Sequence, residues 1–369
     1  MKKAFSAKYW EGDTVYYETV GFRYDKDGAI LCGKLLFEPD KILSVTKPDW
    51  VTPYVEGKDY ILSGRQFSLP EGSSIPVYPY DRNQPKFKGE PMEPVWAAVY
   101  DDPSRFISID PGAYEFQICV SYTHKDAWDG FTPVSQKECL PRTFGKLENG
   151  ETLRVVYFGD SIEAGWEASG VDENVIGMRR DQPGPIEFHL VHDRAPYVPA
   201  WPTLVTTALR EAYPEANVIH INRSCGGMAT PWGIRVAKEL VCAKKPDLVV
   251  LGFGMNQADH PVEEFITDIR KIMEIIREDC PECEFLLLSP MQPNPDAKPY
   301  RHHVLYEQEK ALEALAPDFG AAVAPVHSMF RALLERGKTH ADITGNNINH
   351  PNDFSVRLYF QTIAASLGL

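Results

Sequence analysis

The chain has 369 residues, of which 24% are charged and 43% hydrophobic, and a formal net charge of −14. This acidic balance argues against a nucleic-acid partner or an anionic membrane surface. A chain of this length exceeds one ordinary hydrophobic core, so we predict two domains, residues 1–148 and 149–369.

The N-terminal stretch MKKAFSAKYWEGD contains lysines but no apolar segment of the kind found in signal peptides. No run reaches the roughly 18 apolar residues that a membrane-spanning helix needs. The seven cysteines form an odd and scattered set, which is typical of reduced thiols. We therefore predict a cytoplasmic protein with no membrane partner. Nothing in the sequence indicates its oligomeric state.

Residues 1 to about 145 have the character of an all-β unit. Aromatic and β-branched residues are concentrated in four segments bounded by turn residues, and no long helical period appears between them. The predicted strands are 14–24, 29–39, 95–102 and 116–124. This pattern predicts a β-sandwich or jelly roll.

From residue 151 onward, short apolar runs alternate with longer periodic segments. The predicted strands are 153–158, 217–222, 247–253, 284–290 and 320–326, and the predicted helices are 201–213, 234–245, 262–279, 303–316 and 329–337. An amphipathic terminal helix follows, with Asp353 or Ser355 as its N-cap. Continuous apolar strands that alternate with helices predict a parallel sheet covered on both faces, a three-layer α/β/α domain.

Four loops at the carboxyl edge of the predicted parallel sheet carry residues suited to acyl transfer. Ligands bind at this edge in such sheets. Ser161 is a potential nucleophile and His350 a base that could activate it. A tetrahedral intermediate needs hydrogen-bond donors for its oxyanion. The backbone N–H groups of Ser161 and Gly227 and the side-chain amide of Asn256 could supply three.

These four blocks, in this order, resemble the SGNH (GDSL-type) esterase and lipase superfamily. The resemblance covers roughly residues 151–369. It implies Ser161 as nucleophile, Gly227 and Asn256 as oxyanion donors, and His350 as base, with no cofactor and no metal. A β-sandwich that precedes such a domain is similar to carbohydrate acetyl esterases of this superfamily.

The sequence departs from the family pattern at two positions. Gln257 stands where the family usually has aspartate after the block asparagine. Asn347 stands three residues before His350, where the family usually places its catalytic aspartate, so the group that orients the imidazole is open. Asn347 or a backbone carbonyl could orient it, giving a Ser–His dyad. Another acid could substitute, or the enzyme could be slow or inactive. The substitute acids are Asp342, Asp353 and Glu163.

Three tryptophans fall near the predicted crevice. Sugar rings pack on aromatic faces, so Trp166 and Trp232 are possible substrate contacts, although core packing explains a large aromatic equally well. For Trp201 we favour packing. His189, His192, His302 and His303 lack carboxylates at metal-ligand spacing, and we interpret them as solvated positions.

The sequence thus predicts a serine esterase that hydrolyses small O-acyl esters, above all O-acetyl groups on carbohydrates. Its partner would be a small-molecule or oligosaccharide ester. Three alternatives stay open: a lipid or other short-chain esterase, an acyltransferase of the same fold, and a non-catalytic carbohydrate-binding protein.

Overall fold

The computed structural model describes residues 3–80, 96–99, 101–102, 104–170, 177–178, 185–186, 194–300 and 304–369. Its C-terminal part is built on a five-stranded sheet with strand order β12-β9-β13-β14-β15, in which every pair is parallel. The strands are β9 (Thr152–Gly159), β12 (Asn217–Asn222), β13 (Leu248–Gly252), β14 (Glu284–Leu288) and β15 (Ala322–Ala324). This confirms the predicted parallel sheet.

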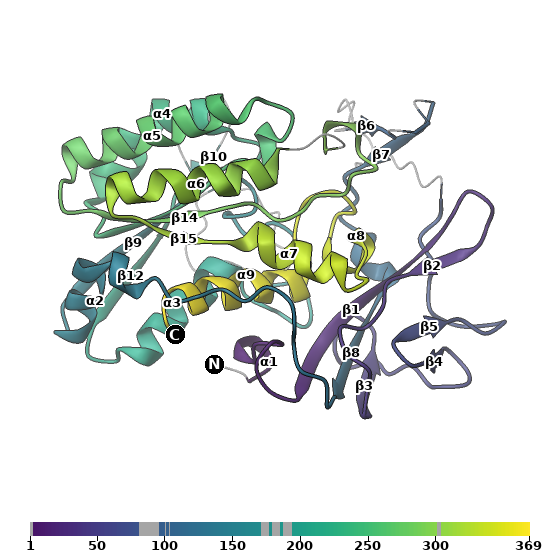
Figure 1. Cartoon of the computed structure of the whole chain (residues 1–369). Helices are drawn as coiled ribbons and strands as arrows, with labels where there is room; N and C mark the ends of the chain where they lie inside the picture. The colour runs from purple at the N-terminus through teal and green to yellow at the C-terminus, as the bar shows by residue number, and fades with distance from the viewer. Residues whose placement is uncertain are drawn as a thin grey trace.

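Helices cover both faces of this sheet (Figure 1). One face carries α4 (Thr230–Val236), α5 (Val262–Asp279) and α6 (Leu305–Phe319), and the other carries α3 (Trp201–Ala212), α7 (Val326–Glu335) and α9 (Asp353–Ser366). Alternate side chains of β9 enter opposite cores: Val156 and Phe158 pack with the first group, Val155 and Tyr157 with the second. Fully buried strands of this kind explain the uninterrupted apolar runs in the sequence.

The helix predicted at 329–337 begins three residues earlier, as α7, and two other predicted helices differ in character as well. The segment predicted as 234–245 begins earlier, as α4, because Pro231 occupies its first turn, where the fixed φ of proline favours a helix start. It continues as a π-helical turn, η3 (Ala237–Val241), and a 3₁₀ turn, η4 (Cys242–Lys244).

In α9 neither Asp353 nor Ser355 is the N-cap. Asn352 has the extended backbone of a cap, and its side chain accepts a hydrogen bond from the backbone N–H of Ser355 at 3.0 Å.

The helix α9 is buried on all sides rather than amphipathic. Its polar residues Arg357 and Gln361 face the N-terminal part of the chain instead of solvent. The Arg357 guanidinium donates to the carbonyls of Ala4, Tyr16 and Tyr17 at 2.8–2.9 Å. These backbone acceptors replace the water that the polar face would otherwise need.

The N-terminal part contains a four-stranded antiparallel sheet, β2-β1-β8-β3. Its strands are β1 (Thr14–Tyr24), β2 (Ile30–Cys32), β3 (Lys41–Thr46) and β8 (Gln117–Thr123). Two ribbons accompany it, β4 (Ile61–Ser63) with β5 (Gln66–Ser68) and β6 (Trp96–Ala98) with β7 (Phe106–Ser108). Among the described residues these ribbons do not form a second broad sheet, so the sandwich stays a prediction.

Smaller elements complete the description. They are the helices α1 (Lys3–Ser6), α2 (Pro141–Glu148) and α8 (His340–Ile343), and the short strands β10 (Gly177–Met178) and β11 (Pro185–Ile186). The helix α2 lies against the C-terminal sheet, because the Glu284 carboxylate at the start of β14 accepts from the backbone N–H groups of Arg142 and Thr143. The predicted domain boundary at 148/149 stays a prediction.

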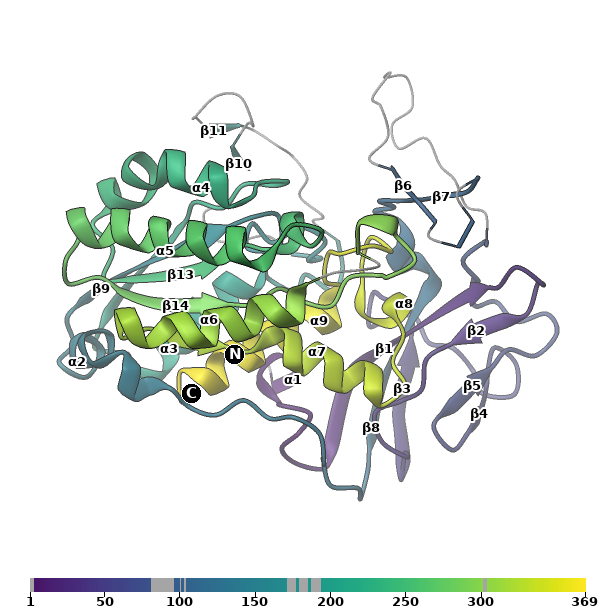
Figure 2. The same cartoon turned by 45° about the horizontal axis from the view of Figure 1, so that its top comes forward.

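The N-terminal sheet lies beside α7, α8 and α9 of the C-terminal part (Figure 2). A single cluster of buried hydrophobic side chains includes Val20 and Phe22 of β1 together with Tyr359 and Ile363 of α9. The two parts of the chain therefore share one continuous core.

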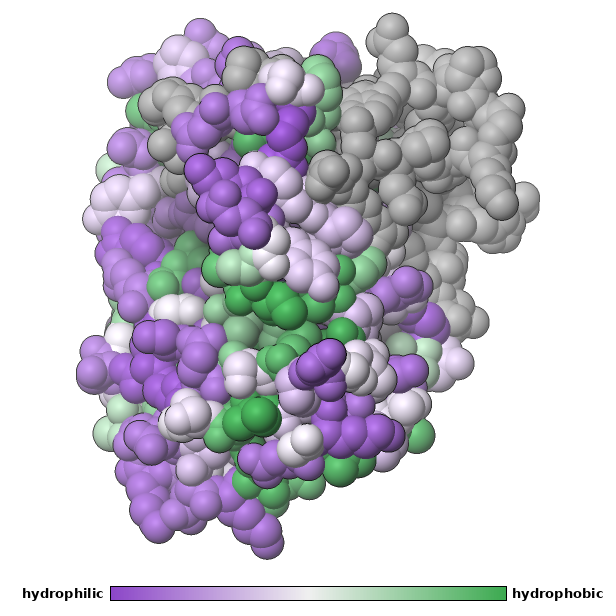
Figure 3. Space-filling view, turned by 90° about the vertical axis from the view of Figure 1, so that its right-hand side faces the viewer, coloured by the Kyte–Doolittle hydropathy of each residue, from purple (hydrophilic) through white to green (hydrophobic). Residues whose placement is uncertain are grey.

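The side of the molecule that the N-terminal strands form exposes several apolar side chains. Figure 3 shows hydrophobic residues gathered along the middle of this side of the molecule. Ile30, Leu31, Leu43 and Ile61 are each 41–48% exposed on β2, β3 and β4. No helix of the described residues is both long and apolar enough to span a bilayer.

Candidate active site

Ser161 and His350 meet at the carboxyl edge of the parallel sheet. Ser161 follows β9, a strand paired on both sides by β12 and β13, by two residues, and His350 lies on the loop between α8 and α9. The His350 Nε2 is 2.8 Å from the Ser161 Oγ, a hydrogen-bond distance. Both side chains are buried. An imidazole in this position can accept the hydroxyl proton, so the pair can generate a nucleophilic alkoxide.

The loop that carries His350 is shaped by the side chain of Asn346. The Asn346 Oδ1 accepts from the backbone N–H groups of Ile348, Asn349 and His350 at 2.9–3.0 Å. The Gly345 N–H closes the turn on the His350 carbonyl at 2.9 Å. Asparagine suits this role because its short amide can take over backbone hydrogen bonds in a turn. The turn chemistry of this stretch thus fixes the position of the base.

The N-terminal sheet holds the same loop from outside. Gln117 at the start of β8 donates through Nε2 to the carbonyls of Ala341 and Thr344 at 2.7–2.8 Å and accepts from Asn352 through Oε1 at 3.1 Å. The backbone N–H of Asp110 donates to the Asn346 carbonyl at 3.1 Å. The β-rich part of the chain therefore contributes directly to placing His350.

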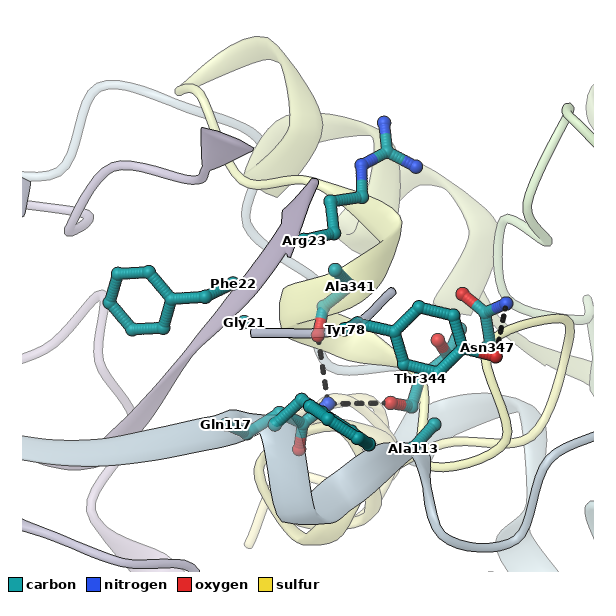
Figure 4. A pocket seen from close by; sticks show the side chains of 10 residues that line it. Gly21, Phe22, Arg23, Tyr78, Ala113, Gln117, Ala341, Thr344 and Asn347 are labelled. Carbon is teal, nitrogen blue, oxygen red and sulfur yellow. Dashed lines mark hydrogen bonds between the residues drawn. The ribbon is translucent and has the colours of Figure 1, made fainter. Parts of the chain in front are cut away.

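A small pocket lies where β1 and η1 (Ala113–Phe116) meet this loop (Figure 4). Its lining residues do not include Ser161 or His350. Asn347 lines it, and the Asn347 Nδ2 lies 3.5 Å from the Tyr78 hydroxyl. The pocket therefore marks the seam between the N-terminal sheet and the base loop.

The predicted oxyanion donors come from the loops after β12 and β13. Gly227 has a φ of +73°, a conformation that glycine adopts without strain. The Asn256 Nδ2 donates one hydrogen to the Met228 carbonyl at 2.9 Å, which joins the two loops. The neighbouring Gln257 accepts from the backbone N–H of Thr230 at 3.0 Å and so holds the start of α4. The departure from the family pattern at Gln257 thus has a structural use.

Four of the orienting groups proposed from the sequence are engaged away from His350. Asn347 has a left-handed backbone, with a φ of +67°, and its amide lies against Tyr78. Asp342 accepts from the Gly21 N–H at 2.7 Å and forms the capping box of α8. Glu163 accepts from the Asp160 N–H at 3.0 Å, and Asp353 accepts from the Ser169 N–H at 2.8 Å. These contacts do not support any of the four as the partner of the imidazole.

The acid nearest to the imidazole is one that the sequence reasoning missed. The Glu167 Oε1 is 3.7 Å from the His350 Nδ1, and both side chains are 4% exposed. Glu167 lies six residues after Ser161 in a run of turns and has a φ of +68°. The sequence carries no signal for this left-handed conformation.

Two buried carboxyl groups lie beneath the nucleophile. Burial raises the pKa of Asp160 to about 6, and burial, followed by the nearby Asp160 charge, raises the pKa of Glu163 well above its ordinary value. The Asp160 Oδ1 accepts from the Ile162 N–H at 2.9 Å. These contacts shape the turn that presents Ser161.

The three tryptophans have different environments. Trp166 is half-buried, and its ring stands edge-to-face with His350 at 5.4 Å between ring centroids. Trp232 is 7% exposed and packs against Phe158 at 5.6 Å, so core packing accounts for it. Trp201 is fully buried, as expected for packing. Of the two possible substrate contacts, the geometry leaves Trp166.

Within the part of the chain that the structure describes, no group of three or more His, Cys, Asp or Glu side chains is arranged to hold a metal ion. His189, His192, His302 and His303 lie outside the described residues.

Comparisons with known proteins identify a family. The profile of the GDSL-like lipase/acylhydrolase family matches residues 157–355, more than half of the chain. Comparison with curated protein sequences gives no match.

Several solved structures align with part of the chain. One is a two-domain esterase (CEX) active on acetylated mannans, with 17% identity over 64% of this chain and 55% of that one and a TM-score of 0.46. The alignment thus spans about half the length of that esterase. An acetylxylan esterase, Axe2 from Geobacillus stearothermophilus, aligns with 16% identity over 59% of this chain and 94% of that one, with a TM-score of 0.43. A putative GDSL-like lipase from Parabacteroides merdae aligns with 18% identity over 58% of this chain and 95% of that one, with a TM-score of 0.43.

Proposed function

The chain belongs to the GDSL-like lipase/acylhydrolase family, and we propose that it is a serine esterase that hydrolyses small O-acyl esters through an acyl-serine intermediate on Ser161. The observation that carries the proposal is the 2.8 Å contact between the Ser161 Oγ and the His350 Nε2. Both groups are buried at the sheet edge where ligands of parallel α/β proteins bind.

In the proposed reaction, His350 takes the hydroxyl proton as the Ser161 Oγ attacks the acyl carbonyl carbon. The negative charge that develops on the carbonyl oxygen is stabilised by the backbone N–H groups of Ser161 and Gly227 and the second amide hydrogen of Asn256. Loss of one such donor typically costs about 3 kcal/mol of transition-state stabilisation. The protonated imidazole then gives its proton to the leaving alkoxide oxygen, and the alcohol departs.

Deacylation repeats these steps with water. His350 removes a proton from a water molecule, the resulting hydroxide attacks the acyl carbon, and the ester bond to Ser161 breaks. The imidazole returns its proton to the Ser161 Oγ, and the carboxylic acid is released. The enzyme is then in its starting state, and one ester and one water have become one alcohol and one carboxylic acid.

The proposal is tested with Ser161→Ala. We expect the wild type to turn over p-nitrophenyl acetate and to be labelled at Ser161 by a fluorophosphonate probe. The variant should lose at least a thousandfold in kcat, because the covalent route is closed, and should not be labelled. A wild type that is neither active nor labelled would instead favour a non-catalytic carbohydrate-binding protein.

For the substrate we propose O-acetyl groups on carbohydrates. The half-buried Trp166 beside the Ser161–His350 pair supports this, because an indole face suits the C–H face of a sugar ring. A series of p-nitrophenyl esters should show kcat/KM falling from acetate to butyrate and longer chains. Acetate release from acetylated oligosaccharides should fall at least tenfold in Trp166→Ala. Equal activity on long acyl chains would point to a lipid esterase, and acyl transfer to added alcohols to an acyltransferase.

A further inference from the structure

The orientation of His350 requires a partner on its second nitrogen. For Nε2 to accept the Ser161 hydroxyl proton across their 2.8 Å contact, the neutral imidazole must carry its own proton on Nδ1. The Nδ1 atom is buried and has no hydrogen-bond partner among the described residues, backbone carbonyls included. A buried donor left without an acceptor costs about 1–3 kcal/mol, so a nearby acceptor is expected to serve it.

The Glu167 carboxylate is placed to be that acceptor. Its Oε1 is 3.7 Å from Nδ1, slightly beyond a hydrogen bond, and both side chains are 4% exposed. Hydrogen bonds of catalytic groups are often long without substrate and tighten when it binds. Asp342, Asp353 and Glu163 are engaged by backbone N–H groups elsewhere.

The backbone places Glu167 beside the base loop. Glu167 adopts a left-handed conformation, which costs a residue with a Cβ roughly 1–2 kcal/mol. Such strain persists where the surrounding structure requires it, and it clusters at functional sites. On the base loop, a Cβ at Gly345 would stand 2.9 Å from the Glu167 Cβ. The absence of a side chain at Gly345 therefore lets Glu167 lie beside the loop that carries His350.

We propose that Glu167 is the positioning residue of the base: its carboxylate accepts the His350 Nδ1–H and stabilises the imidazolium that forms during acylation. The inference rests on the proposed esterase function. It replaces the missing family aspartate with an acid from the nucleophile loop rather than from the base loop. The proton stays on Nδ1 throughout, and only the Nε2 proton is exchanged with Ser161 and the substrate.

The test compares Glu167→Gln and Glu167→Asp with the wild type on p-nitrophenyl acetate. Loss of the charge should lower kcat on the order of 100- to 10,000-fold, as for triad acids elsewhere, with KM changed less than threefold because the acyl and alcohol groups bind elsewhere. Glu167→Asp keeps the charge and should retain at least ten times the kcat of Glu167→Gln. If Glu167 had a purely structural role, the charged Glu167→Asp variant would not have a higher kcat than the neutral Glu167→Gln variant.

Two controls sharpen the result. Glu284→Gln neutralises another buried carboxylate, at the start of β14. It should lower the melting temperature, since one backbone acceptor is lost, but leave the kcat of the folded protein within about threefold of the wild type. Asn347→Ala removes the side chain at the family position and should leave the kcat of the folded protein within about threefold, since that side chain lies against Tyr78. Glu167→Met is a second neutral variant in case Glu167→Gln does not fold.

The outcomes separate the two proposals. A wild type without turnover or Ser161 labelling sinks the proposed function whatever Glu167 does. With an active wild type, a folded neutral Glu167 variant that keeps kcat within threefold overturns the role of Glu167. So do equal kcat values for Glu167→Gln and Glu167→Asp together with a folded Asn347→Ala variant that loses as much kcat as either.

Discussion

At the scale of single residues, the carboxyl pair under the nucleophile has a consequence for stability. Asp160 and Glu163 are both buried, and burial is the largest cause of the rise in each pKa. The nearby His350 charge acts in the opposite direction on the pKa of Asp160 without cancelling the effect of burial. The folded protein therefore holds protons that the unfolded chain has released.

This difference predicts how stability depends on pH. The pKa of Asp160 is about 6 in the folded protein against an ordinary value of 3.8. Between these values the unfolded state binds fewer protons, so stability falls as pH rises, by about 3 kcal/mol for this carboxyl alone. Asp160→Asn should remove this contribution. Urea unfolding at pH 4 and pH 7 should therefore show a smaller loss of unfolding free energy in the variant, and equal losses would refute the assignment.

The residues of the site differ in how well the sequence predicts them. Ser161 and His350 follow elements whose carboxyl ends meet at one sheet edge, so their approach follows from topology. The position of Glu167 depends on one left-handed residue, and that of Asn347 on another, with φ values of +68° and +67°. No periodicity or turn motif encodes these two angles. For that reason the sequence suggests Asn347 as the group that orients His350 and gives no indication of Glu167.

At the scale of elements, the parallel sheet and its helices are predictable because their patterns are long and regular. The strands β12 and β13 and the helix α5 lie within one residue of their predicted ranges. The N-terminal strands are harder, since the predicted segment 29–39 contains only the three residues of β2. Short antiparallel strands are defined by cross-strand pairing more than by their own composition.

The helix α9 shows why tertiary contacts limit such predictions. Its polar residues Arg357 and Gln361 give the sequence an amphipathic pattern, which ordinarily indicates a solvent-facing side. Here the carbonyls of Phe5 and Ala7 accept from Gln361 at 3.0 Å, and those of Tyr16 and Tyr17 accept from Arg357. A polar face satisfied by distant backbone looks the same in the sequence as one satisfied by water.

At the scale of the whole molecule, the N-terminal sheet behaves as part of the catalytic unit. It shares a hydrophobic cluster with α9, and Gln117 fixes the loop of His350. A buried ion pair adds to the contact between the N-terminal sheet and the C-terminal part. The Lys338 Nζ, just before α8, donates to the Glu18 Oε1 of β1 at 2.8 Å, and neither side chain is exposed. The Tyr122 hydroxyl donates to the other carboxylate oxygen at 2.6 Å.

The shared hydrophobic cluster and the Lys338–Glu18 ion pair predict that the N-terminal and C-terminal parts of the chain unfold together. Lys338→Met leaves the Glu18 carboxylate buried without its cation, which should lower the unfolding free energy by about 3–5 kcal/mol. The double variant with Glu18→Gln should recover part of that loss, because the uncompensated charge is gone. Urea titrations followed by tryptophan fluorescence and circular dichroism should give one coincident transition for each variant. An N-terminal sheet that unfolds in a separate step, unaffected by Lys338→Met, would contradict the shared core, since the ion pair and the cluster both tie β1 to the helices beneath the active site.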